Sequence, residues 1–226
     1  MNNNLKIMMI AAVLVAPSFA LDLGAVFSNQ KKAAFPDTCE MHMKTTVLLP
    51  GMQTQVVETD VLTAGESKSI TTIKSSMMQM KMVKNGDHLK VIDLKTGKTM
   101  PSQNIPAENP ADVNKQMGSP EDYNAPVKEG SLWKITPKDA SKPTLYYSTS
   151  KNRVMKMTMN VAAGNLGMTT AESVFEYCDN SCLLPGTLKK VTITSQLPTG
   201  GESKVVVDVT NAKQRKALPS RMFDFD

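Results

Sequence analysis

The residue types that catalyse reactions are scarce in this sequence and do not form a working set. Ser148 and Lys151 reproduce the Ser-x-x-Lys spacing of penicillin-binding enzymes, and Lys95-Thr96-Gly97 reproduces their Lys-Thr-Gly. The two motifs stand in the wrong order and the motif between them is missing, so both are chance matches. The chain has 2 histidines, and His42 lies between methionines on a predicted strand. Because a nucleophile, a base and an orienting residue cannot be assembled, we predict a protein that is not an enzyme and needs no cofactor.

Methionine is far more informative, because the chain carries 17 and many recur at every second position. At this spacing the side chains of a strand point to one face of its sheet. Thioethers are flexible and polarisable, so a methionine-rich face adapts to ligands of varied shape, such as acyl chains. Two other interpretations are an ordinary methionine-rich core and a site for the soft cations Cu(I) or Ag(I). The rows are Met41 and Met43; Met78, Met80 and Met82; and Met155, Met157 and Met159.

The chain has three cysteines, and they would meet an oxidising compartment if the protein is exported, as predicted below. Cys178 and Cys182 flank Asp179-Asn180-Ser181 in a predicted hairpin loop, so we predict a local disulfide that leaves Cys39 free. The alternative pairs Cys39 with one of the two. No zinc site is expected, because the spacing to the histidines matches no known pattern.

Residues 1–20 are typical of a secretory signal peptide. Lys6 supplies a positive charge, Ile7 to Ala16 is an apolar run, and Ser18-Phe19-Ala20 offers small residues for cleavage after Ala20. The sequence therefore predicts an exported protein whose mature part, residues 21–226, is a single domain. Without Lys6, 25 basic and 21 acidic side chains give the mature chain a net charge of +4. The spread of the lysines, the export and the few aromatic residues argue against nucleic-acid binding.

Most of the mature chain alternates apolar and polar residues, as is typical of antiparallel sheet with one apolar face. Before the first strand, Asp22 to Phe35 is predicted as a short amphipathic helix that Pro36 ends. Residues 100–130 contain 5 prolines and are predicted either as a surface loop or as a small helical lid, with helices beginning near Asn109 and Ser119. The predicted strand-like segments comprise residues 38–49, 53–62, 67–75, 77–84, 88–93, 131–138, 144–160, 169–177, 184–195 and 202–211, and Ser148 is expected in a turn within segment 144–160.

The order of these segments resembles that of the LolA-like periplasmic lipoprotein carriers, the outer-membrane lipoprotein-sorting superfamily. Leu132 to Lys138 is similar to the family's apolar-x-Leu-x-Pro-Lys strand, and Leu184-Pro185 is similar to its Leu-Pro strand entry. Val205 to Asn211, followed by Leu218-Pro219 and Met222-Phe223, resembles the closing strand and the terminal phenylalanine. The resemblance covers most of the mature chain, and it depends on order and spacing rather than on any single motif.

The resemblance implies a mainly β fold: a curved antiparallel sheet, or incomplete β-barrel, with a short N-terminal helix and a small helical lid. Its cavity would hold the acyl chains of a lipoprotein or lipid in the periplasm. An inner-membrane ABC transporter would be the donor and an outer-membrane protein the acceptor. We expect a monomer. The alternatives are soft-metal binding and an envelope protein that uses the fold without a transferable ligand. The residues predicted to line the cavity are Met41, Met43, Met78, Met80, Met82, Met155, Met157, Met159, Phe175, Tyr177, Val191, Ile193, Val205 and Val207.

Overall fold

The structure, a computed structural model, describes residues 21–32, 34–65, 67–100, 117–162, 168–197 and 200–224. The predicted signal peptide and the predicted lid helix beginning near Asn109 lie outside the described residues, apart from Met117 at the end of that helix.

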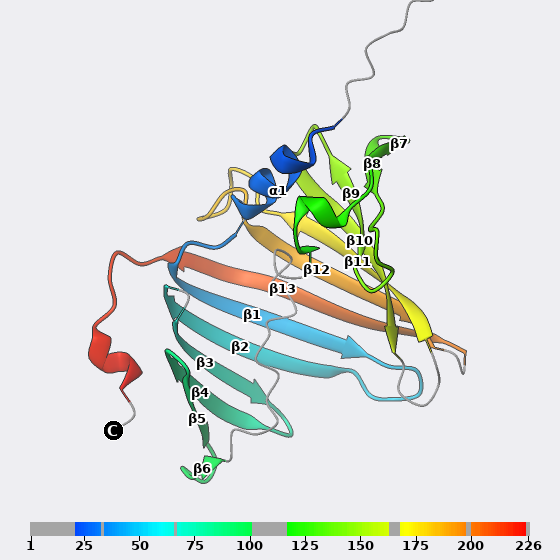
Figure 1. Ribbon diagram of the computed structural model, residues 1–226. Helices are drawn as coiled ribbons and strands as arrows, with labels where there is room; N and C mark the ends of the chain where they lie inside the picture. Colours follow the sequence, from blue (N-terminus) through cyan, green and yellow to red (C-terminus); the bar gives the residue numbers. More distant parts are fainter. Residues whose placement is uncertain are drawn as a thin grey trace, which may run out of the picture.

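The described strands form one antiparallel sheet of 13 strands that is strongly curved and not closed (Figure 1). Alternating apolar and polar residues produce this architecture, because one face of each strand is buried and the other meets solvent. The strands are β1 Thr38–Leu48, β2 Gln55–Ala64, β3 Lys68–Ser75, β4 Gln79–Asn85, β5 His88–Asp93, β6 Thr99–Met100, β7 Val127–Glu129, β8 Leu132–Ile135, β9 Thr144–Ser148, β10 Arg153–Ala162, β11 Met168–Tyr177, β12 Leu188–Gln196 and β13 Glu202–Gln214.

The first and last strands meet in the middle of the sheet. The order runs β6-β5-β4-β3-β2-β1-β13-β12-β11-β10-β9-β8-β7, so two successive series of hairpins join where β1 pairs with β13. The free edges are β6 and β7, of 2 and 3 residues. Short edge strands offer few unpaired backbone groups to another chain, which limits edge-to-edge association.

The N-terminal helix α1 comprises Leu23–Lys31, and Asp22 caps it by accepting a hydrogen bond from the backbone N–H of Gly24. The prediction that the helix continues to Phe35 is wrong. The backbone N–H of Lys32 bonds to the carbonyls of Ser28 and Gln30 and closes the last turn. Of the described helices, none is long and apolar enough to cross a membrane.

The main core lies on the inner face of the sheet, under α1 (Figure 1). Pairs such as Phe175 with Val191 and Val191 with Val207 place apolar side chains from adjacent strands side by side on this face. A 3₁₀ helix η1, Pro120–Asp122, adjoins α1 and begins at the capping box of Ser119 and Asp122, close to the second helix start predicted from the sequence.

A second, smaller apolar contact lies on the outer face. The C-terminal 3₁₀ helix η3, Ser220–Phe223, contacts β3 and β4. Phe223 is fully buried there, and its backbone carbonyl accepts a 3.4 Å hydrogen bond from Asn85. On this face the register aligns Leu62, Ile70 and Val83. The tail therefore covers an apolar row that would otherwise face solvent.

Candidate functional site

The inner face brings together many of the side chains predicted to line a cavity. Each lies on a strand whose alternation directs it to the side that α1 covers. Five of them belong to the main buried cluster, namely Met43, Met157, Phe175, Val191 and Val207. Three more, Tyr177, Ile193 and Val205, pack against that cluster while remaining partly exposed.

The inner face continues beyond this cluster onto β2 to β5. The pairs are Met41 with Val61, Val61 with Thr71, Thr71 with Met82 and Met82 with Val91, so a row of four apolar side chains and Thr71 crosses five strands. Met80 lies on the same side of β4 as Met82, opposite Ile73. Met41, Met80 and Val91 are buried, whereas Met82 is half-buried.

The two longer methionine rows are less regular than the sequence suggests. Met78 lies in the β3–β4 turn rather than in a strand. The backbone N–H of Met78 donates a hydrogen bond to the Ser75 hydroxyl, and the backbone N–H of Ser75 donates one to the Met78 carbonyl. The strand predicted from residue 77 thus begins at Gln79. On β10 the register with β9 shifts between Val154 and Lys156, so a bulge interrupts the alternation at Met155. Met159 remains on the inner face, opposite Ala171.

Helix α1 is fixed to the sheet by a buried polar group as well as by Val26 and Phe27. The Gln30 side chain donates a 3.0 Å hydrogen bond to the Tyr177 hydroxyl, and its amide oxygen accepts one of 3.0 Å from the backbone N–H of Val154. The Tyr177 hydroxyl donates to the Val154 carbonyl at 2.7 Å. This ring joins α1, β10 and β11 and satisfies polar groups that burial would otherwise penalise.

A second set of polar contacts lies next to this ring. The guanidinium of Arg153 donates a 3.2 Å hydrogen bond to the carbonyl of Asn29 and lies 6.0 Å from the ring centre of Tyr177. The Asn29 side chain donates to the hydroxyl of Tyr147 at 3.1 Å. Nε of Arg153 is buried without a hydrogen-bond partner among the described residues. The C-terminal half of α1 is therefore held by β9, β10 and β11.

The segment after the undescribed part of the predicted lid packs on the inner face. Met117 and Tyr123 are buried in the main cluster, and the Tyr123 ring lies 5.6 Å from that of Phe27. The Tyr123 hydroxyl donates a 2.8 Å hydrogen bond to the Met117 carbonyl. Burial raises the pKa of Tyr123 and that of Tyr177, the latter to about 12.

Sequence reasoning missed the polar residues of this arrangement. Gln30, Asn29 and Arg153 have no motif, and only the helical spacing of Gln30 from Val26 and Phe27 could have placed it on the buried side of α1. Met117 and Tyr123 stand in a proline-rich segment where periodicity is lost. Their burial depends on packing that the local sequence does not encode.

The three cysteines are free thiols in the structure. Burial and the neighbouring thiol of Cys182 raise the pKa of Cys178 to about 11. Burial also raises the pKa of Cys39, whose thiol lies 3.2 Å from the hydroxyl of Thr63. Among the described residues, no group of three or more histidine, cysteine or acidic side chains is arranged to bind a metal ion.

Comparisons with known proteins identify the fold. No protein-family model matches the sequence, and no curated protein matches it. A LolA superfamily protein from Nitrosomonas europaea aligns structurally with a TM-score of 0.60 and 19% identity, covering 91% of this chain and 98% of that one. A putative outer membrane lipoprotein-sorting protein domain from Vibrio parahaemolyticus aligns with a TM-score of 0.53 and 12% identity, covering 89% and 95%. A DUF1329 family protein from Desulfovibrio piger aligns with a TM-score of 0.53 and 12% identity, covering 90% of this chain and 95% of that one.

These similarities define a class of architecture, the LolA-like fold, as the sequence predicted. The fold class is also confirmed: a mainly β, open antiparallel sheet with an N-terminal helix, consistent with an incomplete barrel. At identities of 12 to 19% the comparisons carry no assignment of ligand or partner.

Proposed function

We propose that this protein is a non-enzymatic periplasmic carrier that binds acyl chains of a lipid or lipoprotein on its inner face and carries them toward the outer membrane. The observation that supports this most directly is the apolar row that runs from Met41 through Val61, Thr71 and Met82 to Val91. It extends the inner face well beyond the cluster that α1 covers. A curved sheet with such a face can enclose an elongated apolar ligand.

The energetics suit reversible binding without chemistry. Each buried methylene contributes about 0.8 kcal/mol, so a groove that holds part of one acyl chain retains it firmly. Methionine side chains can repack around chains of different length, which favours a carrier of several ligands over a specific receptor. No bond is made or broken, so this role requires no catalytic residues. The same proposal includes an export signal in residues 1–20 and a single mature domain of residues 21–226. It also includes a donor in the inner membrane and an acceptor in the outer membrane.

The test is native mass spectrometry of the purified mature protein, followed by organic extraction and lipid analysis. We expect bound acylated species. Met82→Asp places a charge on the half-buried part of the inner face and should abolish their retention. Ser28→Asp introduces the same group at an exposed position of α1, away from the inner face, and serves as the control.

A lipid-free protein that takes up no added lipid would contradict the proposal. Equal retention by the Met82→Asp and Ser28→Asp variants would remove the inner face of β4 from the binding site. We chose Met82 because Met157 is 2% exposed within the main core, where a carboxylate would unfold the protein instead of emptying a groove.

A further inference from the structure

Six connections between the described strands lie at one end of the sheet, and we term four of these hairpins the hairpin rim. The pairs Leu48 with Lys204, Val57 with Ser75 and Ala171 with Ser195 show that the β1–β2, β3–β4, β10–β11 and β12–β13 connections lie at this end. The ends of these strands lie together along the lower right of the sheet in Figure 1. A Cβ atom on Gly201 would lie 2.9 Å from Cγ of Pro50, so two of the turns are in contact.

The rim is defined by a near absence of charge. Residues 45–57, 75–80, 157–171 and 191–201 contain no Asp, Glu, Lys, Arg or His. At the opposite end the β2–β3, β4–β5, β9–β10 and β11–β12 connections each contain a charged residue, namely Glu66, Asp87, Lys151 and Asp179, whereas the β7–β8 turn Gly130-Ser131 has none. A loop exposed to water has no reason to lack charges in four separate places, since exposed turns are ordinarily polar. The other two connections at this end of the sheet, β5–β6 and β8–β9, carry Lys95, Lys98, Lys138, Asp139 and Lys142, so the lack of charge is confined to the four rim hairpins.

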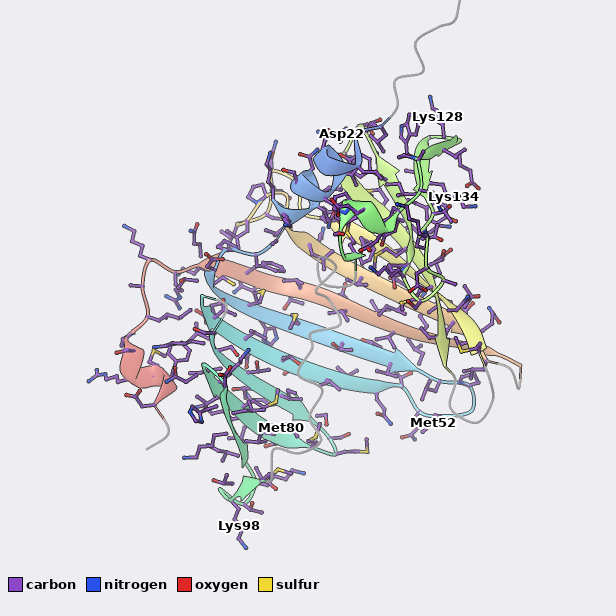
Figure 2. All side chains as sticks on the ribbon, viewed as in Figure 1. Asp22, Met52, Met80, Lys98, Lys128 and Lys134 are labelled. Carbon is purple, nitrogen blue, oxygen red and sulfur yellow. The ribbon has the colours of Figure 1, made fainter. Side chains whose placement is uncertain are left out.

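Apolar side chains project from this uncharged rim. Met77, Met168 and Met52 are 72%, 66% and 58% exposed, and each stands at or beside a turn. Leu48, Leu49 and Met78 are also exposed, at 39%, 37% and 42%. Figure 2 labels Met52 at the end of the β1–β2 hairpin, beyond the last paired residues. These side chains contribute to no described core, so the rim presents apolar surface that another body could cover.

Basic residues border the rim at the free edge of the sheet. Lys95 and Lys98 are exposed in the β5–β6 turn, which lies beside the β3–β4 turn because the backbone N–H of Leu94 bonds to the carbonyl of Gln79. Asp93 is engaged within that turn, where its carboxylate accepts the N–H groups of Lys95 and Thr96. On the other side, Glu202 and Lys204 at the start of β13 offset each other. The border thus carries a positive excess.

We propose that the hairpin rim docks on a lipid bilayer, with Met52, Met77 and Met168 in the interfacial region and Lys95 and Lys98 on anionic headgroups. Single apolar side chains on separate, uncharged tips fit a fluid apolar layer, whereas a protein partner would present a matching groove and polar contacts. The inner face reaches the same end, because Val47, Val205 and Ile193 lie in register directly behind the tips. An acyl chain that left a membrane at the rim would enter the inner face without crossing water.

Vesicle flotation tests this with delipidated mature protein and vesicles of phosphatidylethanolamine and phosphatidylglycerol. Met52→Ser, Met77→Ser and Met168→Ser combined should lower the bound fraction by roughly tenfold, because three apolar anchors are removed. The control combines Val127→Ser and Leu183→Ser, which are 66% and 73% exposed outside the rim, and it should bind like the parent protein. All five positions are exposed, so both variants should keep the parent's stability, which thermal unfolding checks.

Depth of insertion gives a second readout. The chain has a single tryptophan, Trp133, which packs against the main core. Brominated lipid should quench the fluorescence of the tryptophan introduced by Met77→Trp, but not that of the tryptophan introduced by Leu183→Trp. Absence of vesicle binding by the parent protein, or equal loss in the rim and control variants, would overturn the proposal and leave a protein partner as the occupant of the rim. The Met82→Asp variant, which should lose lipid retention, should still float with the vesicles, so failure of the docking proposal and failure of the carrier function give different results.

Discussion

The hydroxyl of Tyr177 accepts a 3.0 Å hydrogen bond from the side chain of Gln30, although the two residues are separated by most of the chain. The same hydroxyl donates a hydrogen bond to the carbonyl of Val154. The backbone N–H of Val154 donates one to the side-chain oxygen of Gln30, which closes the ring. The N-terminal helix is thereby tied to β10 and β11 at one buried point. A helix of 9 residues is marginal alone in water, so this attachment and the burial of Val26 and Phe27 hold it in place.

Replacing Gln30 by methionine should lower the free energy of unfolding by about 2 kcal/mol. The substitution keeps the length of the side chain but leaves the buried N–H of Val154 without its acceptor, at a cost of about 1–3 kcal/mol. Urea unfolding followed by circular dichroism measures the change. Ser28→Met, at an exposed position of the same helix, is the control and should change stability by less than about 0.5 kcal/mol. A loss as large in the control would mean that methionine itself disturbs α1.

Stability should fall at high pH because of Tyr177. Burial raises its pKa to about 12, outweighing the opposite effects of the Gln30 hydrogen bond and the Arg153 charge. A tyrosine in the unfolded chain has a pKa of about 10, so the folded state binds the proton more tightly. The stabilisation is fully present below about pH 10 and is lost as the pH rises toward 12, by about 3 kcal/mol at most.

Urea unfolding between about pH 9 and 11 checks this, with Tyr177→Phe for comparison. The variant should be less stable at the lower pH, since the hydroxyl's hydrogen bonds are gone, but its stability should decline less steeply. Tyr123 leaves a residual slope because burial raises its pKa as well. Parallel curves for the two proteins would show that Tyr177 does not titrate differently on folding.

The strands were predictable from sequence because each turn has its own local signal. Alternation over residues 38–49 predicts both ends of β1 to within one residue, and Asn85-Gly86 predicts the turn between β4 and β5. Edge strands β6 and β7 escaped prediction, because two or three residues are too few to show a period. The register of β10 was also beyond reach, since a bulge at Met155 shifts the alternation without a glycine or proline to mark it.

The candidate site was predictable as a face but not as a set of contacts. Alternation placed Met43, Phe175 and Val191 on one side of the sheet, where they meet under α1. It did not reveal that Gln30 and Arg153 would be drawn in with them. Their partners lie more than a hundred positions away, and the pairing of β1 with β13 places the N-terminal helix beside the second series of hairpins, where those partners lie.

A disulfide between Cys178 and Cys182 remains a prediction, and the sheet order favours it over a bond to Cys39. Three strand spacings separate β1, which carries Cys39, from β11, which ends just before Cys178. At about 4.8 Å for each spacing, this exceeds the reach of a disulfide. Alkylation of the denatured, unreduced protein should therefore label one thiol, on the peptide that contains Cys39. Three labelled thiols, or a label on Cys178, would contradict the local bond.

Phe223 should stabilise the fold even though it lies on the outer face, away from the main core. Its side chain is fully buried, and the tail that carries it covers the row of Leu62, Ile70 and Val83. Phe223→Ala removes this burial and should lower the free energy of unfolding by about 3 kcal/mol. Met222 is 41% exposed in the same helix, so Met222→Ala should cost less than about 1 kcal/mol.

Urea unfolding of the two variants distinguishes a fixed tail from a loosely attached one. If the tail were in rapid exchange with solvent, both substitutions would have similar small effects. A fixed tail also predicts that only Phe223→Ala increases the binding of a hydrophobic dye to the native protein, because the outer-face row then becomes accessible. Since that row lies on the side of β3 and β4 opposite Met80 and Met82, the Phe223→Ala variant should keep the lipid retention proposed for the inner face.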